Sequence, residues 1–482
     1  MKLKDLLSGI QVLDTNANME MEITEVVYDS RKVTSGSLFV AITGFAADGN
    51  RFIPMAVEKG AAVVVTAKRP EMDIPYVLVA SDRLALAMLG INYFGSPAKS
   101  MTMIGITGTN GKTSSTLLLK QMLEKTIGAK AGLIGTMENL IGDVVIPTER
   151  TTPESFELQR LFAQMRDAGC THVVMEVSSH AIALDRVGGV HFQVAAFTNL
   201  TEDHLDFHKT MEHYCDTKAL LFTRCDKGVM NADDSWFDRM RSGSQCDLLT
   251  TSVQGQGDLN AEDLVLEADG IRFRAVFGGK SVPVSLPIPG KFTVYNAMTA
   301  LGIAMQLGVP LEAAAEALAD CKGVKGRVEV VPTPGKDFTV LIDYAHTPDG
   351  LENVLSSVRG FCKGRLISVF GCGGDRDPIK RPIMGEIGVR LADIGIITSD
   401  NPRTEQPGAI ISDILKGVND TMGTYFVIED RKKAIAYAMD IAQKDDIIVL
   451  AGKGHETYQE ICGVKHHLDE REVVAAHLAE MR

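Results

Sequence analysis

The second half of the chain alternates short apolar runs with windows in which hydrophobic residues recur every three or four positions. This alternation predicts strands separated by helices, and so a Rossmann-like parallel β-sheet with helices on both faces. Ligands of such sheets bind beyond the carboxyl ends of the strands, where the chain carries DYAHTP, GCGGDRD, SDNPRTE and AGKGHE. The predicted strands lie at 340–346, 365–371, 393–399, 425–430 and 446–452.

The first half is less regular and breaks at FGSPAKS, residues 94–100. Short apolar runs before the break predict a small α/β domain, and MTMIGIT, THVVMEVSS and VAAFTNL after it are typical of buried parallel strands. The stretch 264–290 alternates and turns at Gly and Pro, which predicts β-hairpins. We therefore predict an α/β protein with three domains, at 1–98, 99–327 and 328–482.

Composition excludes several classes of function. No apolar run reaches the ~18 residues of a membrane span, and MKLKDLLSGI lacks the apolar core of a signal peptide, so we expect a cytoplasmic protein. The eight cysteines form no C-x-x-C pair, which argues against a zinc ribbon or a disulfide framework. The net charge of −13 argues against nucleic-acid binding, although an anionic substrate can bind where basic groups reverse the local field.

The strongest chemical signal is MIGITGTNGKTSSTLLLKQML, residues 103–123. An apolar strand leads into a glycine-rich turn and then into a helical pattern that begins at Lys112. Glycines let backbone amides approach phosphate oxygens, Lys112 can reach the outer phosphates and Thr113 can hold magnesium. The strict G-x-x-x-x-G-K-T template is not met, because its first glycine falls at Ile106. The alternative is a turn without a ligand, but the order of strand, loop and helix favours a nucleotide.

Two further segments carry candidate metal ligands. MEVSSH ends a predicted strand with Glu176, and TNLTEDHLDFH contains His204. Magnesium beside phosphates prefers carboxylates, so Glu176 is a candidate ligand near Thr113. By residue type alone, His204 is better interpreted as a capping or core residue, and no cysteine cluster or H-E-x-x-H motif supports zinc.

The segment SDNPRTEQP places Arg403 between Asp400 and Glu405 at the end of a predicted strand. A turn requires only residues such as Asn, Pro and Gly, so the guanidinium is not needed for local structure. It indicates either a ligand site or a surface ion pair between Arg403 and Glu405 without function.

Taken together, these residues resemble the Mur ligase family, the ATP-dependent amide-forming enzymes of peptidoglycan synthesis. The resemblance covers the whole chain. Within the family, the chain most resembles the members that add the third amino acid to UDP-N-acetylmuramoyl-L-alanyl-D-glutamate. It is carried, in family order, by DSRKVTSGSLFVAI, TGTNGKTSS, TTPES, MEVSSHAI, TNLTEDHLDFH, HYCDTKALLF, YNAMTAL, GRVEVV, IDYAHTPD, DNPRTE and GKGHE.

The resemblance implies that ATP converts the free D-Glu carboxylate into an acyl phosphate, which the amine of the incoming amino acid then attacks. The task of the protein is then mainly placement and charge neutralisation. The implied ATP-binding residues are Gly108, Thr109, Asn110, Gly111, Lys112 and Thr113 in the loop, Asn296 at the adenine, Arg327 at the phosphates and Asp343 at the ribose. Because the last two lie in different predicted domains, ATP is expected to help close the enzyme.

The resemblance also implies two Mg²⁺ ions. Thr113 and Glu176 would bind the first, and His204 with a carbamylated Lys218 would bind the second. The family thus favours a metal role for His204 over the capping role. Carbamylation requires a neutral amine, so burial or nearby positive charge must lower the pKa of Lys218.

For the sugar nucleotide, the resemblance assigns Ser30 and Arg31 of the N-terminal domain to the uridine diphosphate. Thr151, Thr152, Ser178 and Arg186 would hold the muramyl dipeptide, although the threonine pair alone equally fits a helix cap. GFAADG at 44–49 departs from the GHQADG-like form of some relatives, so Phe45 and Ala46 give no uracil contact by analogy.

The members that add the third amino acid use either meso-2,6-diaminopimelate or L-lysine, which differ by one distal carboxylate. A guanidinium pairs bidentately with a carboxylate, so Arg403 predicts diaminopimelate, with L-lysine as the alternative. Asp400 and Asn401 would bind the distal amine, Gly452 and Glu456 would complete the site, and Arg376 would bind the carboxylate at the reacting end.

Two more distant alternatives stay open. Folylpolyglutamate synthase shares the phosphate loop but does not need the DSRKV segment or DNPR. A P-loop switch or motor would hydrolyse ATP without requiring an amino acid. We expect a monomer with small-molecule substrates only, and no nucleic-acid or membrane partner.

Overall fold

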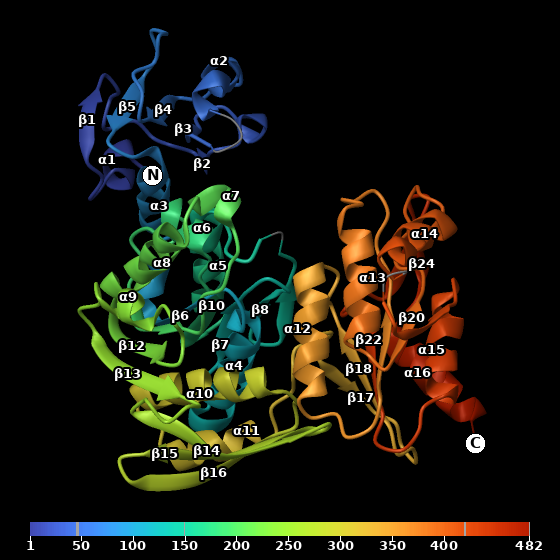
Figure 1. Cartoon of the computed structure of the whole chain (residues 1–482). Coiled ribbons are helices and arrows are strands. Elements are labelled where there is room, and N and C mark those ends of the chain that lie inside the picture. Colours follow the sequence, from blue (N-terminus) through green and yellow to red (C-terminus); the bar gives the residue numbers. More distant parts are fainter. Residues whose placement is uncertain (45–47, 149, 419–420, 482) are drawn as a thin grey trace. The chain divides into compact units, whose positions relative to one another are not determined.

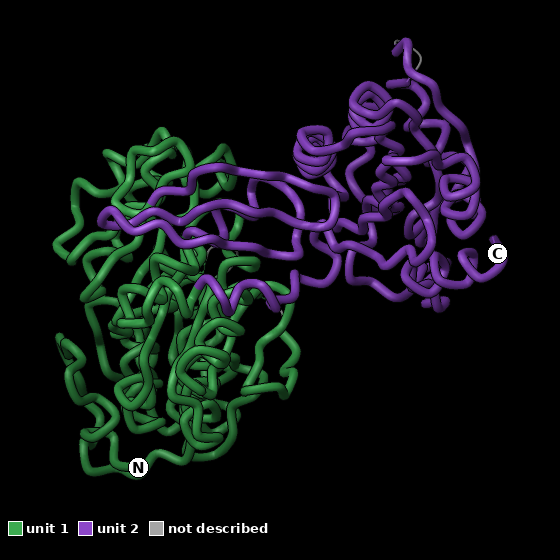
Figure 2. The backbone as a smooth tube through the Cα atoms, turned by 90° about the horizontal axis from the view of Figure 1, so that it is seen from below, with its two compact units in different colours: residues 1–259, 299–314 green, residues 260–298, 315–482 purple. Residues whose placement is uncertain are grey.

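The computed structural model describes residues 1–44, 48–148, 150–418 and 421–481, and the chain forms two compact units (Figures 1 and 2). Unit 1 comprises residues 1–259 and 299–314, and unit 2 comprises residues 260–298 and 315–482. The chain passes between the units within β14 (Leu259–Glu267), α10 (Lys291–Gln306) and α11 (Leu311–Leu318). Among the described residues, no helix combines the length and the hydropathy needed to cross a membrane.

The N-terminal part of unit 1 contains a five-stranded sheet with the order β1-β5-β4-β3-β2. β1 runs antiparallel to β5, and the other neighbours are parallel. All residues of β3 and β4 are buried, as expected for strands covered on both faces. The elements are α1 (Leu3–Leu6), β1 (Val12–Thr15), β2 (Val26–Val27), β3 (Leu38–Ala41), α2 (Ile53–Glu58), β4 (Val63–Thr66), β5 (Tyr76–Val79) and α3 (Asp82–Tyr93).

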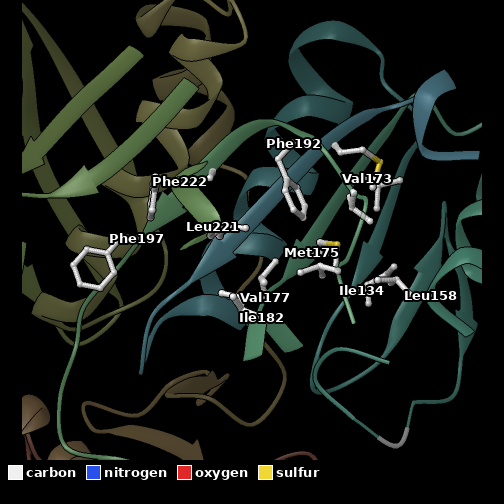
Figure 3. Close-up of a cluster of buried hydrophobic side chains, with 14 of the residues drawn as sticks. Ile134, Leu158, Val173, Met175, Val177, Ile182, Phe192, Phe197, Leu221 and Phe222 are labelled. Atoms are coloured by element: carbon white, nitrogen blue, oxygen red, sulfur yellow. The ribbon is translucent and has the colours of Figure 1, made fainter. Parts of the chain in front are cut away.

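The larger sheet of unit 1 has the order β13-β12-β11-β6-β10-β7-β8-β9. Its strands are parallel from β13 to β7, and β8 and β9 are added antiparallel. Figure 3 shows buried side chains of the hydrophobic cluster at this sheet, among them Val173, Met175 and Phe192 from the strands and Leu158 from α5 (Ser155–Asp167). The strands are β6 (Thr102–Thr107), β7 (Ala131–Ile134), β8 (Asn139–Ile141), β9 (Val144–Ile146), β10 (His172–Glu176), β11 (Phe192–Phe197), β12 (Cys225–Asn231) and β13 (Asp247–Ser252).

The helices of this region connect the parallel strands, as the alternating pattern requires. They are α4 (Lys112–Ile127), α5 (Ser155–Asp167), α6 (Ser179–Ala183), α7 (Leu205–His208), α8 (Met211–Ala219) and α9 (Phe237–Arg241). The predicted hairpins are confirmed, because β15 (Gly270–Phe277) and β16 (Lys280–Leu286) pair antiparallel around two glycines. Two helices follow the hairpins along the chain, α10 and α11 (Leu311–Leu318).

Unit 2 contains the regular sheet that the sequence predicted, with the order β17-β18-β22-β19-β20-β21. Only β17 (Glu329–Val331) is antiparallel, and alternate residues of β18 belong to two hydrophobic clusters, with Leu341 in one and Val340 in the other. Helices therefore cover both faces, which confirms the predicted fold class. The other strands are β18 (Thr339–Asp343), β19 (Leu366–Phe370), β20 (Ile394–Ile397), β21 (Thr424–Val427) and β22 (Ile447–Ala451).

One face of this sheet packs against α12 (Pro348–Arg359), α13 (Lys380–Arg390) and α14 (Pro407–Val418), and the other against α15 (Arg431–Asp440) and α16 (Glu470–Glu480). Glycines bring α13 and α14 close together. A Cβ on Gly385 would overlap the Ile414 carbonyl oxygen, and a Cβ on Gly417 would overlap that of Pro382. The short hairpin of β23 (Tyr458–Ile461) and β24 (Val464–His467) follows the last parallel strand.

We expect the substitution Gly417→Ala to destabilise the protein by about 1–3 kcal/mol, because the added methyl group must push the two helices apart. Differential scanning calorimetry should show a lower unfolding temperature. The matched control is Gly243→Ala, where a Cβ meets no atom within 4 Å and the unfolding temperature should hardly change. Equal stability of both variants would contradict the close approach of α13 and α14.

Candidate active site

The phosphate loop lies between β6 and α4, as predicted. Gly111 has a φ of 83° and Gly108 a φ of 149°, and a Cβ on Gly108 would overlap the Thr198 hydroxyl, so both positions require glycine. The Lys112 ammonium donates to the carbonyl oxygens of Gly108 at 2.9 Å and Thr109 at 2.8 Å. The loop backbone, the N-terminus of α4 and this ammonium together form a positive surface suited to phosphate.

Two residues after β11 hold the loop, and the sequence analysis did not single them out. Asn199 accepts the N–H of Thr109 at its carbonyl oxygen, at 2.8 Å, and the N–H of Asn110 at its side chain, at 2.9 Å. Thr198 donates from its hydroxyl to the Asn110 carbonyl oxygen at 2.6 Å. The signal was present, since both residues open the TNLTEDHLDFH segment at the end of a strand next to β6.

Glu176, at the end of β10, is 1% exposed and lies beside the loop. Its carboxylate accepts the Thr113 hydroxyl at 2.9 Å, the Thr136 N–H at 2.8 Å and the Thr136 hydroxyl at 3.0 Å. A carboxylate next to a threonine hydroxyl at a phosphate loop offers the oxygen ligands that Mg²⁺ prefers, so this pair fits a magnesium ion.

His204 and Lys218 flank the other side of the loop. Lys218 is 1% exposed and donates to the Gly108 carbonyl oxygen at 2.9 Å, with its ammonium 4.7 Å from the centre of the Tyr214 ring. Burial, with Lys112 nearby, lowers the pKa of Lys218 well below its usual value. His204 has a φ of 54°, and its ring lies 4.8 Å from that of His180. In the described part of the chain, no three His, Cys, Asp or Glu side chains are grouped as a preformed metal site.

The residues assigned to the muramyl dipeptide meet next to Glu176. The Thr152 hydroxyl donates to the Glu176 carbonyl oxygen at 2.8 Å and accepts the Ser178 N–H at 3.1 Å, and Arg186 donates to the Thr152 carbonyl oxygen at 3.1 Å. The Thr151 hydroxyl lies 2.9 Å from that of Thr136. The helix-cap alternative for the threonine pair is wrong, because Glu154 is the N-cap of α5.

Ser30 and Arg31 form part of a single helical turn in the N-terminal region, where Ser30 is buried. The Arg31 side chain is 83% exposed and pairs with Asp29, which holds the pKa of that carboxyl at about 2. Phe45 and Ala46 lie outside the described residues.

In unit 2, Asp343 ends β18 and is nearly buried. Its two carboxylate oxygens accept the N–H groups of Val328 at 2.8 Å and Ala345 at 2.9 Å. Burial raises the pKa of Asp343, and Arg327 opposes this rise. Arg327 is exposed and lies over the Tyr344 ring, while Asn296 is buried in α10.

Asp400 and Asn401 follow β20, where the sequence predicted a ligand site. One Asp400 oxygen accepts the Asn401 N–H at 2.7 Å, and the other is buried without a hydrogen-bond partner among the described residues. Gly452, with a φ of 120°, borders this oxygen, since a Cβ there would lie 2.7 Å from it. A buried carboxylate oxygen without a donor is costly unless a ligand supplies one, so Asp400 fits a bound amine.

Asn401 is already oriented by its neighbours. Its side-chain oxygen accepts the Lys453 ammonium at 3.0 Å and the Glu460 N–H at 2.9 Å, and its amide nitrogen donates to Glu456 at 2.9 Å. Both lone pairs of the oxygen are therefore used, and Asn401 can offer a ligand only its second N–H. This suits a carboxylate rather than the amine that the sequence analysis assigned to it.

Arg403 has a φ of 52°, its side chain is 22% exposed, and it donates to the Gly374 carbonyl oxygen at 2.7 Å. Glu405 instead accepts from Arg381 at 2.7 Å, so the alternative of a surface pair between Arg403 and Glu405 is wrong. The Asp375 N–H also donates to Glu405 at 2.6 Å, which ties the GCGGDRD loop to the SDNPRTE loop. Arg376 is exposed in the former loop.

Beneath these loops lie charged residues that the sequence analysis missed. Lys453 has no exposed surface, and Arg431 forms a fully buried ion pair with Glu470 at 2.8 Å. Arg431 Nη1 also lies 4.0 Å from Asp400. No local pattern marks a buried charge, because its partners come from distant segments; the only signal for Lys453 was its place inside GKGHE.

A phosphate loop beside a carboxylate–hydroxyl pair that fits magnesium, and a sheet end that fits an amine and a carboxylate, are features of an ATP-dependent ligase. The chain matches three family models: the Mur ligase middle domain over 106–304, the Mur ligase glutamate ligase domain over 326–454 and the Mur ligase family catalytic domain over 22–88. The chain belongs to the Mur ligase family, whose members are ATP-dependent, amide-bond-forming enzymes.

Two curated relatives bear the name UDP-N-acetylmuramoyl-L-alanyl-D-glutamate–2,6-diaminopimelate ligase. That of Clostridium botulinum is 47% identical over 100% of both chains, and that of Caldanaerobacter subterraneus is 48% identical over 100% of this chain and 99% of the relative. A solved structure of a ligase with the same name has a TM-score of 0.77 at 31% identity, over 100% of this chain and 99% of that chain. Folylpolyglutamate synthase of Mycobacterium tuberculosis, at 18% identity and a TM-score of 0.59, shares only the fold.

We expect Lys453→Met to destabilise the protein by about 1–3 kcal/mol, because Asn401 and Glu456 each lose a buried hydrogen bond from the ammonium. Urea unfolding followed by far-ultraviolet circular dichroism would measure the effect. The control is Lys465→Met, whose exposed ammonium lies 4.0 Å from the centre of the same Tyr458 ring that Lys453 approaches at 5.7 Å. The control should change stability by less than about 0.5 kcal/mol. Equal effects would mean that the buried ammonium does not stabilise the sheet end.

Proposed function

We propose that this chain adds meso-2,6-diaminopimelate to the D-Glu carboxylate of UDP-N-acetylmuramoyl-L-alanyl-D-glutamate, with ATP, in peptidoglycan precursor synthesis. The observation that carries the proposal is Arg403 beside Asp400 at the end of β20, in a chain whose full-length relatives are named for 2,6-diaminopimelate. A guanidinium selects a distal carboxylate, whereas the bare ammonium end of L-lysine would be repelled by it. This disfavours the L-lysine alternative.

The phosphate loop is the natural site for ATP, with Lys112 at the outer phosphates and Gly108, Thr109, Asn110 and Gly111 providing the backbone. Phosphoryl transfer to the D-Glu carboxylate requires placement and counter-charge rather than a protein nucleophile. We assign the adenine to Asn296, the phosphates also to Arg327, and the ribose to Asp343.

The dipeptide end of the sugar nucleotide is assigned to Thr151, Thr152, Ser178 and Arg186. Thr152 bonds directly to Glu176, Ser178 and Arg186 bond to Thr152, and Thr151 connects to Glu176 through Thr136. With this assignment the reacting carboxylate would lie next to the phosphate loop. Ser30 and Arg31 are assigned to the uridine diphosphate.

Magnesium would supply further positive charge at the phosphates when bound. Thr113 and Glu176 would hold the first ion. For a second ion, His204 offers a ring nitrogen, and Lys218 offers an oxygen only as a carbamate, which its burial next to Lys112 favours by lowering its pKa.

For the amino acid, we assign Arg403 and the free N–H of Asn401 to the distal carboxylate, and Asp400, Gly452 and Glu456 to the distal amine. Arg376 is assigned to the carboxylate at the reacting end. Lysine would leave both carboxylate donors unpaired, so discrimination between the two amino acids should be strong.

The domain boundaries 1–98, 99–327 and 328–482 are kept as part of the proposal, with one domain each for the uridine nucleotide, ATP and the amino acid. We further propose that the enzyme acts as a monomer in the cytoplasm, with small molecules as its only substrates.

The proposal is tested by phosphate release from ATP and the sugar nucleotide, with meso-diaminopimelate or L-lysine supplied separately. We expect turnover with diaminopimelate only. Turnover with lysine would keep the ligase reaction but overturn the specificity, and phosphate release without any amino acid would indicate a switch or motor.

In the same assay, Arg403→Ala should lower kcat/KM for diaminopimelate about a hundredfold, the equivalent of losing a charged hydrogen bond, while the KM for ATP stays nearly constant. The control is Arg390→Ala, whose exposed guanidinium pairs with Glu386 on the surface of α13. Equal losses for ATP and diaminopimelate would show that the role of Arg403 is wrong.

The carbamate is tested by incubating the protein with ¹³C-bicarbonate. We expect a carbamate carbon signal in the NMR spectrum that is absent from Lys218→Ala, because only a neutral buried amine reacts with carbon dioxide. The control is Lys227→Ala, which should keep the signal. A spectrum of the unaltered protein without this signal would rule out the modification.

A further inference from the structure

Glu154, the N-cap of α5, is surrounded by three arginines from separate segments of unit 1. Its side chain is 8% exposed, and its Oε2 atom lies 3.6 Å from Arg83 Nη1, 3.6 Å from Arg186 Nε and 3.8 Å from Arg150 Nη1. All three distances are longer than a hydrogen bond. The carboxylate therefore balances charge without using up the donors of the guanidiniums.

The cluster has spare donors as well as excess charge. Three cations face one buried carboxylate, and the Arg83 Nη1 and Arg186 Nε atoms are buried without a hydrogen-bond partner in the described part of the chain. Burial lowers the pKa of Arg186, and Arg150 and Arg83 lower it further, while Glu154 opposes the change. Unpaired buried donors on charged groups are costly, so an anionic ligand that accepts from them would be bound strongly.

Other contacts fix two of the arginines in place. Arg83, in the first turn of α3, donates from Nε to the Thr43 carbonyl oxygen at 3.2 Å, and Arg186 donates from Nη1 to the Thr152 carbonyl oxygen at 3.1 Å. Another acid of α5, Glu157, already accepts the Tyr28 hydroxyl at 2.5 Å. The guanidiniums of Arg83 and Arg186 are thus held in a fixed orientation with donors left over, and the more exposed Arg150 adds a third positive charge.

We propose that Arg83 and Arg150 join Arg186 in binding an anionic group of the sugar-nucleotide substrate, with Glu154 limiting repulsion among the three cations. The inference rests on the proposed function and extends it to two residues that neither the motifs nor the resemblance assigned. Two groups of the substrate have the right chemistry, namely the second carboxylate of the D-Glu residue and the diphosphate. Hydrogen bonds connect Arg186 through Thr152 to Glu176. This connection favours the carboxylate, because of the two groups the carboxylate lies closer to the reacting end of the substrate.

The test is the affinity of the full-length protein for UDP-N-acetylmuramoyl-L-alanyl-D-glutamate, measured by titration calorimetry without amino acid. Arg83→Gln and Arg150→Gln should each weaken binding about tenfold or more, the range for a charged hydrogen bond, and leave ATP affinity within about twofold. The control is Arg241→Gln, whose 54% exposed side chain pairs with Asp238 on α9. Unchanged affinity in both cluster variants would overturn the inference.

Two analogues identify the source of the anion. If it is the carboxylate, an analogue with D-isoglutamine in place of D-glutamate should bind the unaltered protein and Arg83→Gln equally. If it is the diphosphate, the unaltered protein and Arg83→Gln should instead bind equally to N-acetylmuramoyl-L-alanyl-D-glutamate, which lacks the nucleotide. Loss of the same factor with all three ligands would contradict a direct contact. Failure of the unaltered protein to bind the sugar nucleotide would instead contradict the proposed function.

A double variant separates binding from a purely structural role. If the arginines only neutralised Glu154, combining Arg83→Gln with Glu154→Gln would restore the affinity lost in Arg83→Gln. A direct contact predicts that the double variant stays weak while its circular dichroism spectrum matches that of the unaltered protein. Restored affinity would overturn the inference. Arg83→Lys keeps the charge but not the planar fork, so its affinity for the sugar nucleotide should lie between those of the unaltered protein and Arg83→Gln.

Discussion

The buried carboxylate of Glu176 is the interaction on which the nucleotide side of the enzyme depends. A buried charge is stable only when hydrogen bonds replace its hydration, and here threonines from two other segments supply them. These bonds fix the first turn of α4 and the segment after β7 relative to the end of β10. The main-chain carbonyl of the same residue adds Thr152 to the arrangement. One residue, through its carboxylate and its main-chain carbonyl, thus orients groups assigned to phosphate, metal and dipeptide.

Buried charged groups also fix the orientation of side chains at the end of the sheet in unit 2. Here both positive and negative groups take part. Lys453 fixes the orientation of the Asn401 amide, and the Arg431–Glu470 pair lies beneath Asp400. Such pairs contribute little net stability compared with apolar packing, because desolvation offsets their attraction. Their effect is geometric, since an amide with all but one hydrogen bond satisfied can no longer rotate to suit a different ligand.

The fold was largely predictable because hydrophobic residues recur at different intervals in its helices and in its strands. Apolar runs separated by amphipathic windows identified the parallel sheets, and the glycine pattern identified the phosphate loop and the hairpins. The sequence identified the site as a set of residues at strand ends. It did not indicate which of these side chains have a hydrogen-bond donor or acceptor left for a ligand. Nothing local indicates that Asn401 uses both lone pairs, or that Glu405 pairs with Arg381 rather than Arg403, because those partners come from segments far along the chain. The arginine cluster around Glu154 was missed for the same reason.

The left-handed backbone at Arg403 restricts how this family can change its amino-acid substrate. Only glycine, and to a lesser extent asparagine and aspartate, take this conformation at low cost, and β-branched side chains strain it. The N–H of residue 403 donates to the Glu460 carbonyl oxygen, and its carbonyl oxygen accepts the Cys462 N–H, so these bonds hold that conformation independently of the side chain. If the enzyme evolved to use a substrate without the distal carboxylate, Arg403 could therefore be replaced by only a few residues that tolerate this conformation. Other replacements would also disturb the loop to which residue 403 belongs.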